Sequence, residues 1–243
     1  MKKSRLQSTR LLLAAIALLA FPVTLNFFSP YVSIYGAFNG VIAGSVCLFI
    51  AQFFSGLILG RAWCGWLCPI AGLSELTGMI NKKPVKRLPL RIIRYTLFAI
   101  WFSILILGFL AGKQLPKLNL LFATERIISV DEPAKYVIYY GVVGLFFLLS
   151  VTIGKRGACH TVCWMSPFLV AGSKVGRLLH IPQLTVVAEG QSCISCKKCD
   201  AKCPMSLPVC ELQQKGAIIS QHCILCGECI TACPKKVLGY QMH

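Results

Sequence analysis

Four long apolar stretches occupy the first two thirds of the chain. They cover about residues 11–28, 41–59, 92–111 and 136–153, and their one charge, Arg94, lies close to an end. A helix needs roughly 20 apolar residues in a row to cross the hydrocarbon core of a bilayer. The pattern therefore predicts four transmembrane helices.

The pattern changes after the fourth apolar stretch. Residues 167–180 predict a short amphipathic helix along the inner membrane face, with Lys174 and Arg177 toward the lipid headgroups. From residue 182 a cysteine-rich segment predicts short helices and small strand pairs. We therefore expect an all-α membrane domain over residues 1–181, followed by a small α+β domain over residues 182–243.

Composition supports a membrane location. Of the 243 residues, 56% are hydrophobic and only 14% are charged, against about 25% charged in soluble domains. The basic start and first apolar stretch could instead be a cleaved secretory signal. The apolar run continues to Phe28 without a small-residue cleavage site, which favours a retained helix.

The distribution of positive charge predicts the orientation. Of the 25 Lys and Arg residues, 21 lie before the first stretch, from Arg61 to Arg94, or after the fourth stretch, and 4 lie between the third and fourth. Positively charged connections stay in the cytoplasm. The prediction is a multi-pass inner-membrane protein with both termini and residues 182–243 in the cytoplasm. No basic patch with interleaved aromatic residues accompanies the net charge of +17, so nucleic acid is not an expected partner.

A repeated motif follows the second and fourth apolar stretches. Each copy is C-x3-C with an arginine three residues before its first cysteine, and the copies are ninety-five residues apart. This predicts two pseudo-repeats related by a pseudo-twofold axis along the membrane normal. The four "rim cysteines" should then converge at the inner membrane rim: Cys64, Cys68, Cys159 and Cys163. Pro69 favours a helix start just after Cys68.

The rim cysteines allow two interpretations. Four convergent sulfurs could hold a further iron-sulfur centre or act as redox-active thiols. Alternatively, they could be reduced packing residues or a pair of disulfides that brace the rim. Cys47 and Cys210 fall outside the motifs, and we expect both to be packing thiols.

The C-terminal segment contains the motif C-x2-C-x2-C-x3-C-P twice. In bacterial-type ferredoxins this run holds 4Fe-4S clusters, and its fourth cysteine ligates the other cluster. Zinc or a disulfide framework are the alternatives for so many cysteines. The spacing assigns one cluster to Cys193, Cys196, Cys199 and Cys233, and a second cluster to Cys223, Cys226, Cys229 and Cys203.

The joint pattern resembles a known family. Two C-x3-C motifs after the second and fourth of four spans, followed by a two-cluster ferredoxin, are similar to NapH-type membrane quinol dehydrogenases and related polyferredoxins. The resemblance covers nearly the whole chain and implies electron transfer between the membrane quinone pool and a redox partner. The second motif reads Cys163-Trp164 where the family has Cys-Pro, which indicates a divergent member.

Three functions follow from these features. The first is an electron-transfer subunit of a quinol-linked oxidoreductase complex, with quinone or quinol as exchangeable substrate and further subunits as redox partners. Glu75 and His160 are the candidate quinone ligands, although a solvated interfacial carboxylate and a histidine packed near sulfur explain them better. The second is an assembly factor that reduces a metal ion or thiol for another enzyme. The third is a scaffold whose clusters only stabilise it.

Overall fold

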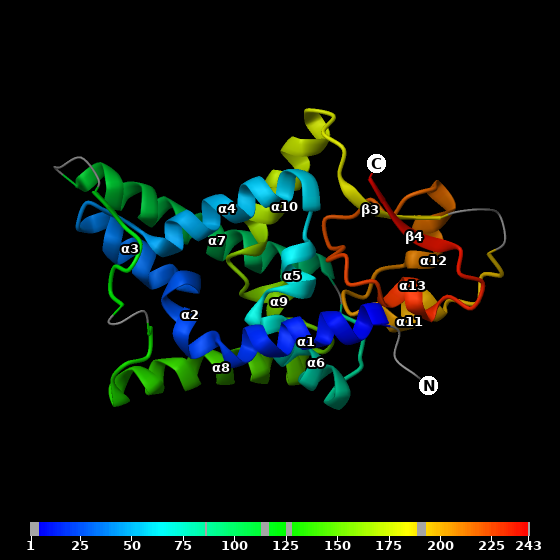
Figure 1. The fold of residues 1–243 in the computed structure, drawn as a ribbon, viewed down its shortest axis with the longest axis horizontal. Helices are drawn as coiled ribbons and strands as arrows, with labels where there is room; N and C mark the ends of the chain where they lie inside the picture. The colour runs from blue at the N-terminus through cyan, green and yellow to red at the C-terminus, as the bar shows by residue number, and fades with distance from the viewer. Residues whose placement is uncertain (1–4, 86, 113–116, 125–127, 189–192, 243) are drawn as a thin grey trace.

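The computed structural model describes residues 5–85, 87–112, 117–124, 128–188 and 193–242. The chain forms a helical part, residues 5–178, and a C-terminal module, residues 184–242. The long helices of the helical part lie on one side of the molecule and the module lies at one end of them (Figure 1).

The first apolar stretch is broken in the structure. Helix α1 covers Arg5–Leu19 and helix α2 covers Phe21–Phe28, with a bend of 81° between them. Pro22 stands in the first turn of α2, where its fixed φ suits a new helix start. Helix α3, Pro30–Phe38, follows, and Ser29 caps it by accepting the Val32 N–H. A single straight span over residues 11–28 is therefore not what forms.

Within the described part of the chain, two helices are long and apolar enough to span a bilayer. Helix α7 covers Arg87–Ala111 and helix α8 covers Pro133–Ile153, and they match the third and fourth predicted spans. The α1–α2 pair would be a third span if counted as one. The second predicted span forms strand β1, Val41–Ala43, and the shorter helix α4, Gly44–Leu59. The apolar helices thus support membrane association, and the fourfold crossing stays a prediction.

The C-x3-C motifs form short helices at the end of α4 and of α8. Helix α5 covers Ala62–Trp66 and helix α9 covers Gly157–Thr161, so their bounds differ by the same ninety-five residues as the motifs. Each is followed by a longer helix: α6, Pro69–Ile80, and α10, Ser166–Leu178. Cys68 has extended backbone just before α6, so the helix start predicted at Pro69 is confirmed.

Helix α10 forms close to the predicted bounds, and one of its faces makes a contact that the sequence does not predict. It packs along α4, with Leu169 and Val170 buried. The helices approach so closely that a Cβ on Gly172 would lie 2.1 Å from the Phe53 carbonyl oxygen. Because glycine permits this contact, one face of α10 belongs to the helical core. Lys174 on the other face is exposed, and its position toward the headgroups stays a prediction.

Two small sheets complete the fold. Strand β2, Lys117–Asn119, pairs in parallel with β1. In the module, β3, Leu184–Ala188, pairs antiparallel with β4, Leu238–Met242. The module also contains α11, Lys198–Lys202; α12, Val209–Leu212; the 3-10 turn η1, Gln213–Lys215; and α13, Glu228–Ala232. Its core is formed by Val186, Met205, Leu207 and Ile224.

Candidate iron-sulfur centre

The two cysteine runs of the module fold with the same backbone. Helices α11 and α13 have bounds thirty residues apart, like the runs themselves. Positive φ angles recur at the same offset, at Ser195 and Leu225, at Lys197 and Gly227, and at Ser206 and Lys236. Residues other than glycine rarely adopt positive φ angles. Their repetition therefore shows that the same cysteine spacing gives the same loop conformation in both runs.

Four cysteines of the module surround one small buried cavity. We call Cys203, Cys223, Cys226 and Cys229 the proximal set, and they line this cavity together with Met205 and Ile224. They are the four residues that the spacing assigns to the second cluster. Burial, reinforced by the neighbouring thiols, raises the pKa of Cys223 to about 11 and of Cys226 to about 12. Iron would therefore have to supply the positive charge that makes them thiolates.

The other four cysteines are less buried, two of them exposed and two half-buried. We call Cys193, Cys196, Cys199 and Cys233 the distal set. Cys193 and Cys196 are exposed, Cys199 belongs to α11, and Cys233 follows α13, which packs against α11. The Cys193 thiol lies beside the thiol of Cys210. The structure thus places Cys210, expected to be a packing thiol, next to the first cluster loop.

The four rim cysteines come together as the repeat predicts. Cys64, Cys68, Cys159 and Cys163 line one cavity between α5, α6 and α9. All fourteen cysteines of the chain carry free thiols. Among the described residues no three potential ligands converge closely enough to hold a single metal ion. A cube does not require that, because each of its thiolates binds a different iron.

Three buried arginines surround the rim cysteines. The exposed fractions of Arg61, Arg94 and Arg156 are 3%, 1% and 3%. Arg61 lies 3.8 Å from the Cys64 sulfur, Arg94 donates to the Cys159 carbonyl, and Arg156 donates to the Cys64 carbonyl. Each guanidinium keeps a buried Nε without a hydrogen-bond partner in the described structure. Buried cations require a counter-charge, so the donor set fits an anionic group among these thiols.

The rim cavity and the proximal cavity share a wall. Met205 and Ile224 line both. The carbonyl oxygen of Ile224 lies so close to α5 that a Cβ on Gly65 would be 2.4 Å from it. Two side chains therefore separate the thiols of the helical part from the proximal thiols of the module.

Hydrogen bonds fix the proximal loop to the helical part. Trp66 Nε1 donates to the Leu225 carbonyl at 2.9 Å, Arg61 donates to the Gln221 carbonyl at 2.8 Å, and Gln7 donates to the Cys226 carbonyl at 2.9 Å. The donors come from α5 and its start and from α1. The proximal loop therefore has a defined position against the rim.

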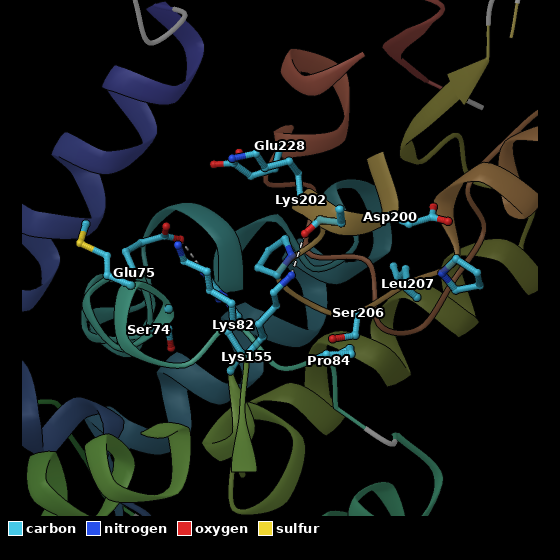
Figure 2. Close-up of a pocket in the computed structure, with 16 residues that line it drawn as sticks. Ser74, Glu75, Lys82, Pro84, Lys155, Asp200, Lys202, Ser206, Leu207 and Glu228 are labelled. Atoms are coloured by element: carbon cyan, nitrogen blue, oxygen red, sulfur yellow. Dashed lines mark hydrogen bonds and ion pairs between the residues drawn. The ribbon is translucent and has the colours of Figure 1, made fainter. Parts of the chain in front are cut away.

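A buried ion-pair network reinforces this docking. Arg10 on α1, with a fully buried side chain, contacts Glu75 on α6 at 2.7 Å and Glu228 on α13 at 2.8 Å, and Arg156 contacts Glu75 at 3.2 Å. Burial raises the pKa of Glu75, but the arginines outweigh it and hold the pKa below its usual value. Both carboxylates line a cavity of about 860 Å³ at the junction, with Lys82, Lys155 and Lys202 around it (Figure 2).

In the structure, the two candidate quinone ligands, Glu75 and His160, contact other protein side chains. Glu75 belongs to the ion-pair network described above. His160 is 1% exposed and packs against the ring of His222, with ring centroids 5.7 Å apart. Neither residue lines the apolar cavity of about 430 Å³ between α2, α3 and α8. The sequence does not predict that Arg10 and Glu228 are partners, because the residues around each of them give no sign of a contact with a segment more than two hundred residues away.

Two families of iron-sulfur domains match this chain. Residues 41–87 match a 4Fe-4S binding domain, and residues 192–238 match a 4Fe-4S dicluster domain. The first segment contains the rim cysteines Cys64 and Cys68, and the second contains all eight cysteines of the two runs. No solved structure matches the chain.

Several curated proteins are similar to most of the chain. It is 28% identical over 197 residues to the electron transport protein YccM of Escherichia coli K12, covering 76% of this chain and 52% of YccM. It is 26% identical over 183 residues to the methylamine utilization ferredoxin-type protein MauN of Methylobacillus flagellatus, covering 72% and 60%. An uncharacterized protein of Methanocaldococcus jannaschii is 28% identical over 169 residues, covering 67% and 66%. The chain thus spans about half to two thirds of the length of these relatives.

Proposed function

We propose that this protein is a membrane-embedded iron-sulfur electron-transfer subunit that connects the quinone pool with a redox partner. The proximal and distal sets would each hold a 4Fe-4S cluster, as the dicluster domain match supports. Iron-sulfur clusters supply one-electron transfer at potentials that the protein tunes. The observation that carries the proposal is the shared wall of Met205 and Ile224, which places the module's buried thiols next to those of the helical part. The names of YccM and MauN agree with this role.

The rim cysteines would hold a third centre. A cluster bound by four thiolates has a net negative charge, which is what the buried Arg61, Arg94 and Arg156 require as a partner. With neutral packing thiols or disulfides, Glu75, which pairs with Arg156 and also with Arg10, would be the only carboxylate among the described residues in contact with any of these three cations. The match of residues 41–87 to a 4Fe-4S binding domain agrees with this reading.

The quinone would bind in an apolar cavity next to the rim cysteines. This cavity, of about 430 Å³, lies between α2, α3 and α8, and its lining is largely apolar, including Phe21, Phe146 and Trp164. Its residues Ile70 and Met165 also line the rim cavity. Cavities of this size and character suit ring-and-tail ligands. The proposed site therefore replaces Glu75 and His160 as the place to look for quinone contacts.

The proposed topology keeps the module on the cytoplasmic side. The excess of Lys and Arg at both ends of the chain supports that orientation. Helix α4 and the α1–α2 pair would complete the four crossings in the manner of the NapH-type proteins. The equal spacing of α5 and α9 supports a twofold relation between the two halves.

Iron analysis of the full chain in nanodiscs tests the third centre. Three cubes predict about twelve iron atoms per chain, and two predict about eight. We expect Cys64→Ser/Cys159→Ser to lose about four, whereas Cys47→Ser in α4 should lose none. An unchanged iron content in the double variant would contradict the rim centre but not the two clusters of the module.

Reduction by a quinol analogue tests the quinone site. Ile70→Trp should fill the cavity and raise the KM for quinol about tenfold without changing iron content. Leu76→Trp, on the same helix but half exposed at 52%, is the matched control. Equal KM values for both variants would overturn the location. Reduction that depends instead on turnover of an added metal ion would support the assembly-factor function.

A further inference from the structure

The distal set lies at a surface that the helical part leaves open. Residues 193–198 are all exposed, and the loop that begins at Cys193 lies at the end of the module farthest from the long helices (Figure 1). The proximal set, in contrast, is covered by α1 and α5. An external protein can therefore approach the distal cysteines directly but not the proximal ones.

Four lysines flank these distal cysteines. Lys197 and Lys198 lie between Cys196 and Cys199, and Lys235 and Lys236 follow Cys233 within three residues. All four are exposed, and no ion pair among the described residues includes them. We call Lys197, Lys198, Lys235 and Lys236, with the distal cysteines, the lysine face.

Two carboxylates that neighbour the cysteine runs, Asp200 and Glu228, have partners within the protein. Asp200 accepts the Cys210 backbone N–H at 2.7 Å and lies 3.7 Å from the Cys199 sulfur. Glu228 is held by Arg10 at 2.8 Å. The acidic residues next to both cysteine runs therefore do not neutralise the lysine face. An exposed apolar side chain, Ile194 at 59%, adds a hydrophobic contact to the positive surface.

We propose that the lysine face is the docking site for an acidic, soluble one-electron carrier protein. The inference rests on the proposed electron-transfer function and adds the class of partner. Opposite charge on two surfaces steers their encounter and raises association rates by 10–10³-fold. A small apolar centre within a charged rim suits a transient complex, which needs fast release. Anionic lipid is the less suitable occupant, because this face lies away from the helices that are apolar enough to enter the bilayer.

Binding of an acidic flavodoxin to the full chain in nanodiscs made of neutral lipid tests the proposal. We expect Lys197→Glu/Lys198→Glu to weaken the Kd at least tenfold at low salt and to flatten its salt dependence. The matched control is Lys174→Glu/Lys215→Glu, which makes the same charge change at exposed lysines outside the face. Iron content and the rate of electron exchange with a small neutral mediator should remain at wild-type values in both variants.

Each outcome has one meaning. Loss of flavodoxin binding in the first variant alone supports the docking site. Equal Kd values for the two variants, or binding of the first variant to flavodoxin at wild-type strength, would overturn it. Failure of the wild-type protein to exchange electrons with the neutral mediator would instead contradict the proposed function. If the first variant alters only association with anionic vesicles, the lysine face serves lipid and the carrier proposal is wrong.

Discussion

The proximal and distal sets share one sequence phrase and one backbone conformation but have opposite surroundings. Cys226 and Cys229 are buried beneath the helical part, whereas Cys193 and Cys196 are exposed. The motif alone does not produce this difference, since both runs repeat the same positive φ angles. Docking of one loop against α1 and α5 produces it. The local sequence therefore determines the conformation of each cysteine loop, and tertiary contacts determine whether its thiols are buried or exposed.

This asymmetry has a physical consequence for electron transfer. Solvent exposure and hydrogen bonds to sulfur tune cluster potentials, so two clusters in identical loops need not be equivalent. The proximal set lies next to Arg61 through the Gln221 contact, and the distal set lies next to exposed lysines. We interpret the first as the connection to the helical part and the second as the connection to a soluble partner.

The strongest test of this order removes one cluster at a time. Cys226→Ser should lower quinol-dependent reduction of a carrier by at least about a hundredfold, because the remaining distal set has no route to the helical part. Cys196→Ser should leave the proximal cluster reducible by quinol. Stopped-flow absorbance with electron paramagnetic resonance measures both. Carrier reduction at the wild-type rate in the Cys226 variant would show that the order is wrong.

The ion-pair network gives the next largest effect. Arg10→Ala leaves Glu75 and Glu228 without their shared partner and should destabilise docking of the module by about 3 kcal/mol, the loss typical of a broken buried ion pair. Arg5→Ala, on the same helix but exposed, should have little effect. Denaturant-induced loss of cluster absorbance measures the difference. Equal midpoints would mean that Arg10 does not hold the module.

A single methyl group tests the contact between α5 and the proximal loop. Gly65→Ala would place a Cβ 2.4 Å from the Ile224 oxygen, so the loop must move away and quinol-dependent reduction of the proximal cluster should slow about tenfold. Gly78→Ala in α6 meets nothing within 4 Å and should be neutral or slightly stabilising. The rates at which quinol reduces the proximal cluster are measured in both variants. Similar rates would argue against a close approach of α5 to the Ile224 carbonyl.

The smallest effect concerns the Leu225 carbonyl. It accepts from Trp66 Nε1 at 2.9 Å and from the Tyr240 hydroxyl at 2.6 Å. Trp66→Phe removes one donor and should cost about 1 kcal/mol. Trp66→Phe/Tyr240→Phe leaves a buried carbonyl unsatisfied and should cost more than the two single changes together. A strictly additive double variant in denaturant titrations would show that water replaces the lost donors.

The sequence predicts local features of this protein well. Cysteine spacing identifies the proximal set that lines one cavity, and the C-x3-C repeat identifies the rim cysteines that line another. Pro69 predicts the start of α6. These placements could be predicted because each depends on covalent spacing or on the backbone preference of one residue, and the assignment of the cysteines to clusters stays a prediction.

Long-range features could not be predicted in the same way. Hydropathy predicts a span over residues 11–28, but hydropathy alone does not predict the bend of 81° between α1 and α2. Arg10 resembles a positive flank of that span and becomes a buried partner of Glu228. Helix α10 has an amphipathic pattern and packs against α4 through Gly172. In each case the outcome depends on contacts with segments distant in the sequence.

The contacts of α1 with the proximal loop also set a sequence of events in biogenesis. Gln7 and Arg10 leave the ribosome more than two hundred residues before Cys226 and Glu228, their partners in the folded protein. The surface that α1 offers to the module is therefore synthesised before the loop that it holds, and docking of the module has to follow synthesis of both segments.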